Sequence, residues 1–221
     1  MSCQLNKDRV NALVEEYGSP LYVFHEDEFR KNYMDLLNTF RAIYPKYNIA
    51  YSYKTNYTPG ICKIVKELGG LAEVVSEMEY MLAKKIGYDS TKIVYNGPVK
   101  GLGLFEHLKN GGVANIDSLD EMKTVVEFAE ANSDCAIRLA FRVNIDIGQG
   151  FISRFGVDAY EEDVGKAELD QAFDMAKSVP NISIVGLHCH IGRSRSIDAW
   201  KNRVRIMFKL IDRYFDKSPE F

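Results

Sequence analysis

Lys54 is the residue of this chain best placed to act as a nucleophile. It follows residues 49–53, a predicted strand end made almost entirely of apolar and aromatic residues. An amine held against such walls is partly desolvated, which lowers its pKa and frees it to form an imine with an aldehyde. The competing interpretation is a lysine whose stem carries the amine into solvent, and position alone favours that one.

Two histidines, His188 and His190, lie in the segment 186–192, Gly-Leu-His-Cys-His-Ile-Gly. Alternate residues of a strand share one face, so both imidazoles are expected to point the same way. Three interpretations are open: a metal pair, an aromatic platform under a flat cofactor, or two histidines satisfied by backbone or water. Metal is the least favoured, because the other histidines, His25 and His107, fall in or beside predicted helices.

Arg142 lies inside a predicted strand, where an unpaired guanidinium is costly. It therefore needs an acid or an anionic ligand. Glu73 and Glu79, near the end of another predicted strand, are the expected partners. A purely structural ion pair and a functional one are equally compatible with this pattern.

The elements that must position these side chains alternate between strand and helix. Period-two and period-3.6 apolar patterns, with turn residues between them, predict a long helix over 27–44 and then alternating strands and helices. Ser76 and Ser118 each begin an S-x-x-E capping box, which marks a helix start. Strands are expected at 48–53, 71–75, 92–95, 113–116, 136–143 and 182–189.

Such alternation implies parallel strands with helical crossovers, in either an open doubly wound sheet or a (β/α)8 barrel. Polar residues lie at or just past most of the predicted strand ends, as a barrel requires, whereas an open sheet gathers ligand groups at one switch point. The strand-end residues are Lys54, Ser76, Asn96, Asp117, Asn144 and His190. We therefore expect an α/β, TIM-type barrel. Six strands are expected where a closed barrel needs eight, so the chain is expected to stop before the barrel is complete.

Composition excludes several classes of protein. The formal net charge of −3 and the scattered basic residues argue against a nucleic-acid-binding protein. No apolar run is long enough to span a bilayer, and the N-terminus lacks the apolar stretch of a secretory signal. The four cysteines form no C-x-x-C pair, which is typical of a reduced, cytoplasmic protein.

Short segments along nearly the whole chain resemble, in one order, the motifs of fold-type III pyridoxal 5'-phosphate (PLP)-dependent amino-acid decarboxylases, the diaminopimelate and ornithine decarboxylase-like family. The similarity is to the N-terminal, barrel portion of that family. The matching segments are Gly18-Ser19-Pro20-Leu21-Tyr22-Val23, Tyr53-Lys54-Thr55-Asn56, Glu73-Val74-Val75-Ser76 with Glu79, Arg142-Val143-Asn144, Ser153-Arg154-Phe155-Gly156 and Gly186-Leu187-His188-Cys189-His190-Ile191-Gly192.

The resemblance implies roles for these residues. Lys54 would hold PLP as a Schiff base, and His190 would stack on the cofactor ring. Arg142, Glu79 and Arg154 would form a charged network around the site. The activity implied is decarboxylation of a basic or diamino amino acid, in a protein that is a homodimer when full length. The alternative is a non-catalytic, PLP-binding or regulatory relative; a PLP racemase fits the residues after Lys54 less well.

Three departures from the family pattern bear on these roles. Arg193 stands where the family has a serine that touches the PLP phosphate, and a guanidinium can pair with phosphate in its place. Glu73 replaces the usual aspartate and Arg154 the usual lysine, so charge is kept while reach changes. Glu73 and Arg193 thus join Lys54, Arg142 and His190 as expected cofactor-binding residues.

The resemblance also predicts a division of the chain. Residues 1–25 would form a helix and a strand, 21–24, that normally joins the family's C-terminal β domain. Residues 26–221 would form the incomplete PLP-binding barrel.

Overall fold

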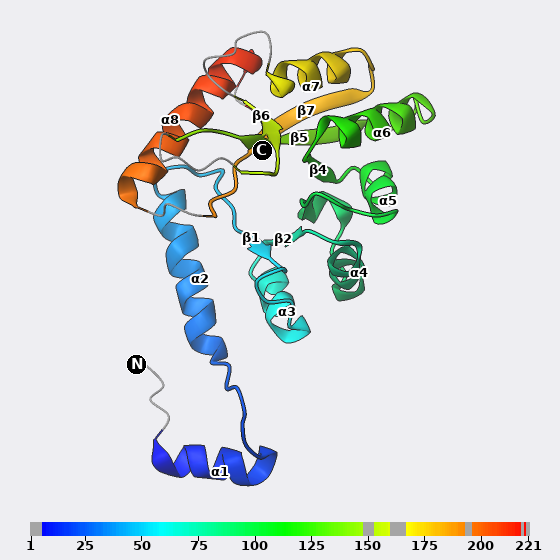
Figure 1. Ribbon diagram of the computed structural model, residues 1–221. Coiled ribbons are helices and arrows are strands. Elements are labelled where there is room, and N and C mark those ends of the chain that lie inside the picture. Colours follow the sequence, from blue (N-terminus) through cyan, green and yellow to red (C-terminus); the bar gives the residue numbers. More distant parts are fainter. Residues whose placement is uncertain (1–5, 148–152, 160–166, 193–195, 218, 220–221) are drawn as a thin grey trace.

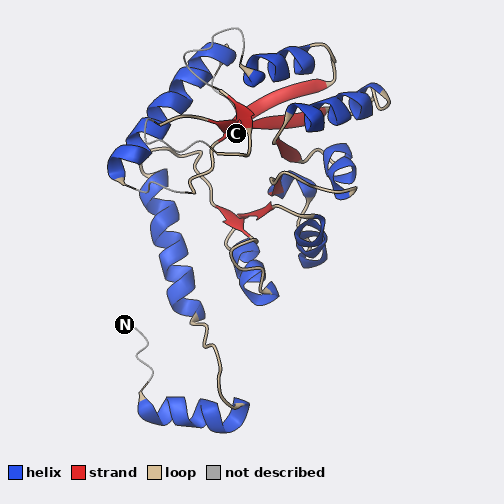
Figure 2. Cartoon of the chain, in the orientation of Figure 1, coloured by secondary structure: helices blue, strands red, loops and turns tan. Residues whose placement is uncertain are grey.

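The computed structural model describes residues 6–147, 153–159, 167–192, 196–217 and 219. Strands and helices alternate along it from residue 50 onward (Figures 1 and 2). In chain order the elements are α1 (Lys7–Tyr17), α2 (Glu26–Arg41), β1 (Ala50–Ser52), α3 (Pro59–Glu67), β2 (Leu71–Val74), α4 (Glu77–Ile86), a 3-10 turn (Ser90–Lys92), β3 (Ile93–Tyr95), α5 (Gly103–Lys109), β4 (Val113–Ile116), α6 (Leu119–Glu130), β5 (Ile137–Asn144), β6 (Val157–Asp158), α7 (Glu168–Lys177), β7 (Ile182–His188) and α8 (Ile197–Tyr214).

The six predicted strands are confirmed, and all of them pair in parallel. Each of β1 to β5 pairs with the next along the chain, and β7 pairs with the other side of β5. The two-residue strand β6, which has no sequence period to predict it, forms a short ladder with the end of β5. Because the strand order never reverses, the sheet has the order of an α/β barrel and lacks the switch point of a doubly wound sheet.

The sheet follows an arc, and helices α3 to α7 lie along its outer side (Figure 1). Both predicted capping boxes start helices there. The Ser76 hydroxyl accepts from the Glu79 N–H at 3.4 Å, and the Ser118 hydroxyl accepts from the Glu121 N–H at 3.2 Å. These contacts fix where α4 and α6 begin, so the short loops just before them are held at the C-terminal ends of β2 and β4.

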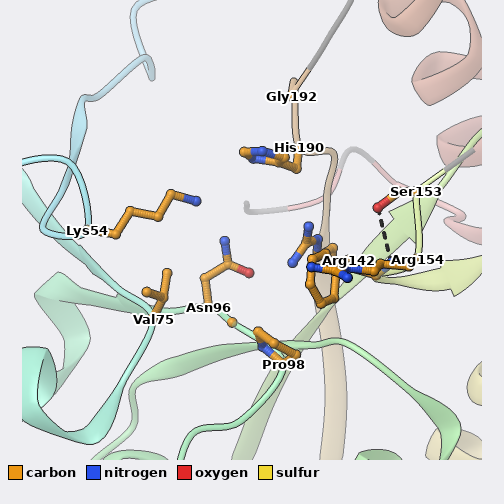
Figure 3. A pocket seen from close by; sticks show the side chains of 11 residues that line it. Lys54, Val75, Asn96, Pro98, Arg142, Ser153, Arg154, His190 and Gly192 are labelled. Atoms are coloured by element: carbon orange, nitrogen blue, oxygen red, sulfur yellow. Dashed lines mark hydrogen bonds between the residues drawn. The ribbon is translucent and has the colours of Figure 1, made fainter. Parts of the chain in front are cut away.

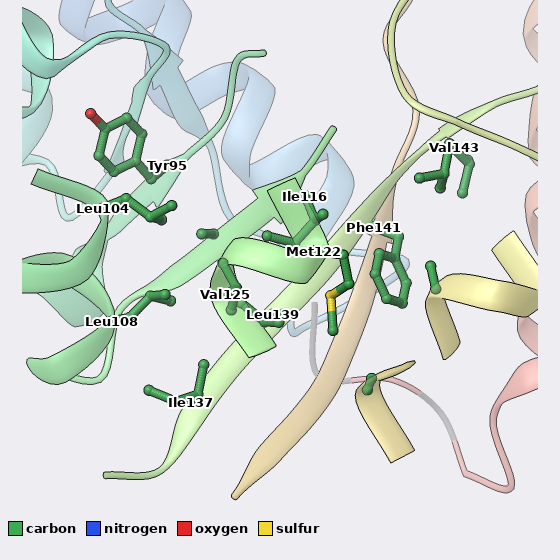
Figure 4. Close-up of a cluster of buried hydrophobic side chains, with 14 of the residues drawn as sticks. Tyr95, Leu104, Leu108, Ile116, Met122, Val125, Ile137, Leu139, Phe141 and Val143 are labelled. Atoms are coloured by element: carbon green, nitrogen blue, oxygen red, sulfur yellow. The ribbon is translucent and has the colours of Figure 1, made fainter. Parts of the chain in front are cut away.

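The main core lies between the sheet and the outer helices (Figure 4). It joins Ile116 of β4, Ile137 and Phe141 of β5, and Met122 and Val125 of α6, all buried. Strands β2 to β5 are buried almost throughout, as parallel strands covered on both faces are. This packing gives the central strand ends a rigid frame.

The N-terminal segment consists of a helix followed by chain that pairs with no described strand. Helix α1 has no buried residue and lies apart from the body of the molecule (Figure 1). Residues 21–24, expected to form a strand that joins the family's C-terminal β domain, pair with no strand in the described chain, and Tyr22 is fully exposed. A strand needs a partner for its backbone groups, and none is within this part of the chain. The division at residue 25 stays a prediction. No described helix has the length and apolar character needed to cross a bilayer.

Candidate active site

A cavity of about 720 Å³ opens at the C-terminal ends of the strands (Figure 3). Its size is that of a small-molecule site, for which about 300–1,000 Å³ is usual. The lining residues come from the ends of β1, β2, β3, β5 and β7 and the loop after β5. They are Lys54, Val75, Asn96, Gly97, Pro98, Arg142, Ser153, Arg154, Phe155, His190 and Gly192. The structure thus brings Lys54, Arg142, Arg154 and His190 together, as the sequence predicted.

Lys54 extends into the cavity from the turn after β1 (Figure 3). Two backbone hydrogen bonds hold this turn, from Tyr53 N to Glu73 O at 2.9 Å and from Thr55 N to Ser52 O at 3.2 Å. Tyr53 is fully buried, but Lys54 is exposed. Of the two interpretations of Lys54, the exposed side chain fits the one in which the stem carries the amine toward solvent. The reason is that β1 is an edge strand, with no neighbour on its outer side in the described chain.

Arg142 is paired with an acid that the sequence did not single out. Its Nη1 donates to Asp117 Oδ1 at 2.8 Å, and both side chains are buried. Strands β4 and β5 pair with Ile116 opposite Phe141, so the next residues along, Asp117 and Arg142, are neighbours. The expected partners Glu73 and Glu79 are wrong: Glu73 lies on β2 and Glu79 in the first turn of α4, and β3 and β4 separate β2 from β5.

Asp117 is itself held by a second buried ion pair. Glu121 Oε2 accepts from the Asp117 N–H at 2.8 Å, and Glu121 Oε1 accepts from Lys100 Nζ at 2.6 Å. Lys100 also donates to Gly97 O at 2.7 Å. Burial lowers the pKa of Lys100, and the Glu121 carboxylate counters this by favouring the ammonium. A continuous series of hydrogen bonds therefore runs from Lys100 through Glu121 and Asp117 to Arg142 at the cavity wall.

The loop after β5 is fastened by Asn144, the last residue of the Arg-Val-Asn motif. Asn144 Nδ2 donates to Ser153 O at 2.7 Å and to Asp158 Oδ1 at 2.8 Å, while its Oδ1 accepts from the Ser153 N–H at 3.1 Å. Ser153 Oγ in turn accepts from the Phe155 N–H at 3.1 Å (Figure 3). These bonds place residues 153–155 against the cavity.

Phe155 stands between two cations. The guanidinium carbon of Arg142 lies 5.1 Å from its ring centroid, and that of Arg154 lies 4.9 Å from it. No carboxylate pairs with Arg154 in the described ranges. Arg142, Arg154 and the Lys54 amine thus give the cavity a positive character, which suits a phosphate or carboxylate.

The two histidines have different surroundings. His188 Nε2 lies 3.3 Å from Asn96 Nδ2, and burial, with help from Arg142, lowers the pKa of His188 to about 3. His188 is therefore a satisfied, neutral histidine. His190 lies beyond the end of β7 and its ring faces the cavity (Figure 3). Among the described residues no group of three potential metal ligands gathers anywhere.

Glu73 and Glu79 stand apart from the cavity lining. Glu73 lies behind Asn96, whose Nδ2 donates to Glu73 Oε1 at 3.1 Å. Glu79 Oε2 accepts from the Val75 N–H at 2.7 Å, and burial raises the pKa of Glu79. Glu79 therefore fixes the loop after β2, and the network expected between Glu79 and the arginines is absent from the described contacts. Arg193 lies outside the described residues.

Three residues of the site were missed as functional residues in the sequence, although two of them were noted as strand-end polar residues. Asn96 lines the cavity, Asp117 pairs with Arg142, and Phe155 contacts both arginines. For Asn96 and Asp117 the available signal was their position directly after a strand, combined with the register of neighbouring strands. For Phe155 it was the position next to Arg154.

The residues present fit a flat, anionic aldehyde cofactor. They supply a primary amine, two guanidinium groups for anionic substituents and the rings of His190 and Phe155 for a planar face. A buried carbonyl oxygen of Asn96 has no hydrogen-bond partner in the described chain.

Residues 30–218 match the family model described as pyridoxal-dependent decarboxylase, pyridoxal binding domain. The diaminopimelate decarboxylase of Aquifex aeolicus is 31% identical over 194 residues, 83% of this chain and 43% of that protein. That of Methanocaldococcus jannaschii is 30% identical over 193 residues, 81% of this chain and 43% of that protein. A solved structure of M. jannaschii diaminopimelate decarboxylase with L-lysine has a TM-score of 0.76 and 27% identity, covering 91% of this chain and 49% of the other.

The chain thus spans less than half the length of these two curated relatives. The family model nevertheless covers most of the chain, including every described residue that lines the cavity. The chain belongs to the pyridoxal-dependent decarboxylase family and carries that family's pyridoxal-binding domain.

Proposed function

We propose that this chain is the cofactor-binding part of a PLP-dependent amino-acid carboxy-lyase in which Lys54 holds the cofactor covalently. The observation that carries the proposal is the Lys54 amine in one cavity with two arginines and a histidine ring, in a chain of this family. The Lys54 side chain extends into the cavity, where its amine can reach the aldehyde carbon of a bound cofactor.

The other residues would bind and orient. Arg142 and Arg154 would pair with the anionic groups of cofactor and amino acid, and the His190 ring would cover one face of the cofactor. Glu73 would take part indirectly: its carboxylate accepts a hydrogen bond from the Asn96 amide and would hold that cavity-lining side chain in place. Arg193 follows Gly192, which lines the cavity, and would pair with the cofactor phosphate. When bound, PLP supplies an electron sink for the pair of electrons left behind as the carboxylate departs.

The proposed substrate is a basic or diamino amino acid. Support comes from the relatives, which are diaminopimelate decarboxylases, and from the solved relative that contains L-lysine. The three described cysteines carry free thiols, which supports placing the protein in a reducing compartment, the cytoplasm.

We also propose that the full-length protein is a homodimer. Helix α8 exposes Ile197, Trp200, Val204 and Phe208 along one stripe, and contiguous apolar surface of this kind marks an interaction face. Sedimentation velocity of the full-length product is expected to give twice the monomer mass.

Release of labelled carbon dioxide from carboxyl-labelled meso-diaminopimelate and L-lysine tests the activity. The PLP-loaded full-length product is expected to release it, and the Lys54→Ala variant to lose at least a thousandfold in rate. Lys63→Ala is the matched control, because Lys63 is exposed on α3 and outside the cavity. Cofactor binding without release from either amino acid, or from the other basic amino acids, would favour a non-catalytic PLP-binding relative.

A further inference from the structure

Asn96 is the most deeply buried polar residue of the cavity lining. It directly follows β3, only 2% of it is exposed, and Figure 3 shows its side chain between Lys54 and Arg142. Gly97, with φ of +95°, turns the chain sharply behind it. The side chain is thus held by the strand end and by the turn.

Its neighbours fix the orientation of the amide. Asn96 Nδ2 lies 3.1 Å from Glu73 Oε1 and 3.3 Å from His188 Nε2. A carboxylate only accepts hydrogen bonds, so the amide nitrogen must face Glu73. Neutral His188 can accept the second N–H at Nε2, and its pKa near 3 keeps it neutral at physiological pH. Both amide hydrogens are therefore in use.

This orientation leaves Asn96 Oδ1 buried without a partner. Of the partnerless buried side-chain atoms in the described chain, it is the only one on a residue that lines this cavity. Leaving a buried acceptor unsatisfied is unfavourable, and most such groups in folded proteins find a donor. A donor that enters with a ligand would remove the penalty.

We propose that Asn96 is a further ligand-binding residue, whose Oδ1 accepts a hydrogen bond from an N–H or O–H group of the molecule bound in the cavity. The inference rests on the proposed function, so that molecule is PLP or the amino acid. Glu73 and His188 are positioning residues: both contact Nδ2 of the ligand-binding amide and so fix which end of the amide carries the unpartnered oxygen. A site built to satisfy a donor discriminates against a ligand that lacks it.

The test measures two dissociation constants with the full-length protein. Absorbance titration with PLP gives the first, and titration of the PLP-loaded protein with L-lysine gives the second. In Asn96→Ala, we expect one of them to rise about tenfold, as loss of a hydrogen bond from a polar ligand predicts. A rise for PLP assigns the donor to the cofactor. A rise for L-lysine alone assigns it to the amino acid.

Asn115→Ala is the matched control. Asn115 is also buried, on the neighbouring strand β4, and its Oδ1 also lacks a partner, but it does not line the cavity. Both constants are expected to stay at their wild-type values there. Should Asn96→Ala not fold, Asn96→Ser replaces it, since a serine hydroxyl still offers Glu73 a donor.

Two results would overturn the inference, and they are distinguishable. If wild type binds PLP and L-lysine and the Asn96 variant matches it in both constants, the inference fails while the proposed function stands. If wild type binds no PLP, the proposed function fails and the inference falls with it.

Discussion

Arg142 Nη1 donates to Asp117 Oδ1 at 2.8 Å, and this buried pair joins the ends of β4 and β5 at the cavity wall. Asp117 Oδ2 also accepts from the Gly156 N–H at 3.3 Å. The same carboxylate therefore sets the position of a cavity-lining cation and of the loop that carries Arg154. Buried partners thus hold the cations at the cavity wall in place.

Asp117→Asn is expected to weaken both stability and cofactor binding. It leaves the Arg142 guanidinium buried without an opposite charge, a change that typically costs about 3–5 kcal/mol. Urea unfolding of the full-length protein measures the free energy, and PLP titration measures the affinity. Asp120→Asn is the control, because Asp120 is an exposed acid two residues into α6. Equal unfolding free energies for Asp117→Asn and wild type would contradict the assignment.

The Lys100–Glu121 pair is expected to show strong coupling. Lys100→Met leaves the Glu121 carboxylate largely buried and unpaired, so the free energy of unfolding should fall by about 3 kcal/mol. Adding Glu121→Gln should restore most of that loss, because the glutamine carbonyl still accepts the Asp117 N–H. A double-mutant cycle by chemical denaturation checks this, and additive losses would show that the two groups do not interact.

Gly97→Ala is expected to disturb the turn behind the cavity. At φ of +95° an alanine is strained, and its Cβ would lie 2.4 Å from the backbone oxygen of Val75. We expect a loss of roughly 2 kcal/mol or more in unfolding free energy, with weaker PLP binding. Gly60→Ala is the matched control: its Cβ meets nothing within 4 Å, and alanine suits a helix better than glycine. The prediction fails if both variants are as stable as wild type.

His188 is expected to make stability fall in acid. Burial lowers its pKa from 6.5 to about 3 in the folded protein, so the unfolded chain takes up a proton first as the pH falls. The contribution of neutral His188 to the free energy of unfolding is fully present above pH 6.5. It is lost as the pH drops toward 3, by no more than about 1.4 kcal/mol per pH unit. His188→Gln should flatten the slope of unfolding free energy against pH in this window. His107, whose pKa burial lowers to about 4, contributes equally to both proteins. Identical slopes would show that His188 is not held neutral.

The helices and strands could be predicted from local sequence patterns because contacts between residues close in the chain decide where they begin. The S-x-x-E signals at Ser76 and Ser118 gave the starts of α4 and α6, and the capping hydrogen bonds are formed. In a capping box the glutamate carboxylate is expected to accept from the N–H of the serine itself. Here the two glutamates accept from the N–H one residue earlier, that of Val75 or Asp117. The same acids thereby shape the loops at the cavity, which the motif alone does not reveal.

Pairings across strands were harder to predict, because they depend on register and strand order. Arg142 was expected to pair with Glu73 or Glu79, but the alignment of β4 with β5 brings it to Asp117. The surroundings of Lys54 depend on whether β1 has an outer neighbour, which no residue near Lys54 encodes. The site residues could thus be named from strand ends and motifs, while their partners required the sheet.

Borohydride reduction of the PLP-incubated full-length protein, followed by peptide mapping, shows whether Lys54 holds the cofactor. We expect a pyridoxyl group on the peptide that contains Lys54, and its loss in Lys54→Ala but not in Lys63→Ala. A well-folded protein with no adduct at Lys54, or an equal adduct on another lysine in Lys54→Ala, would contradict the assignment of this cavity as the cofactor site.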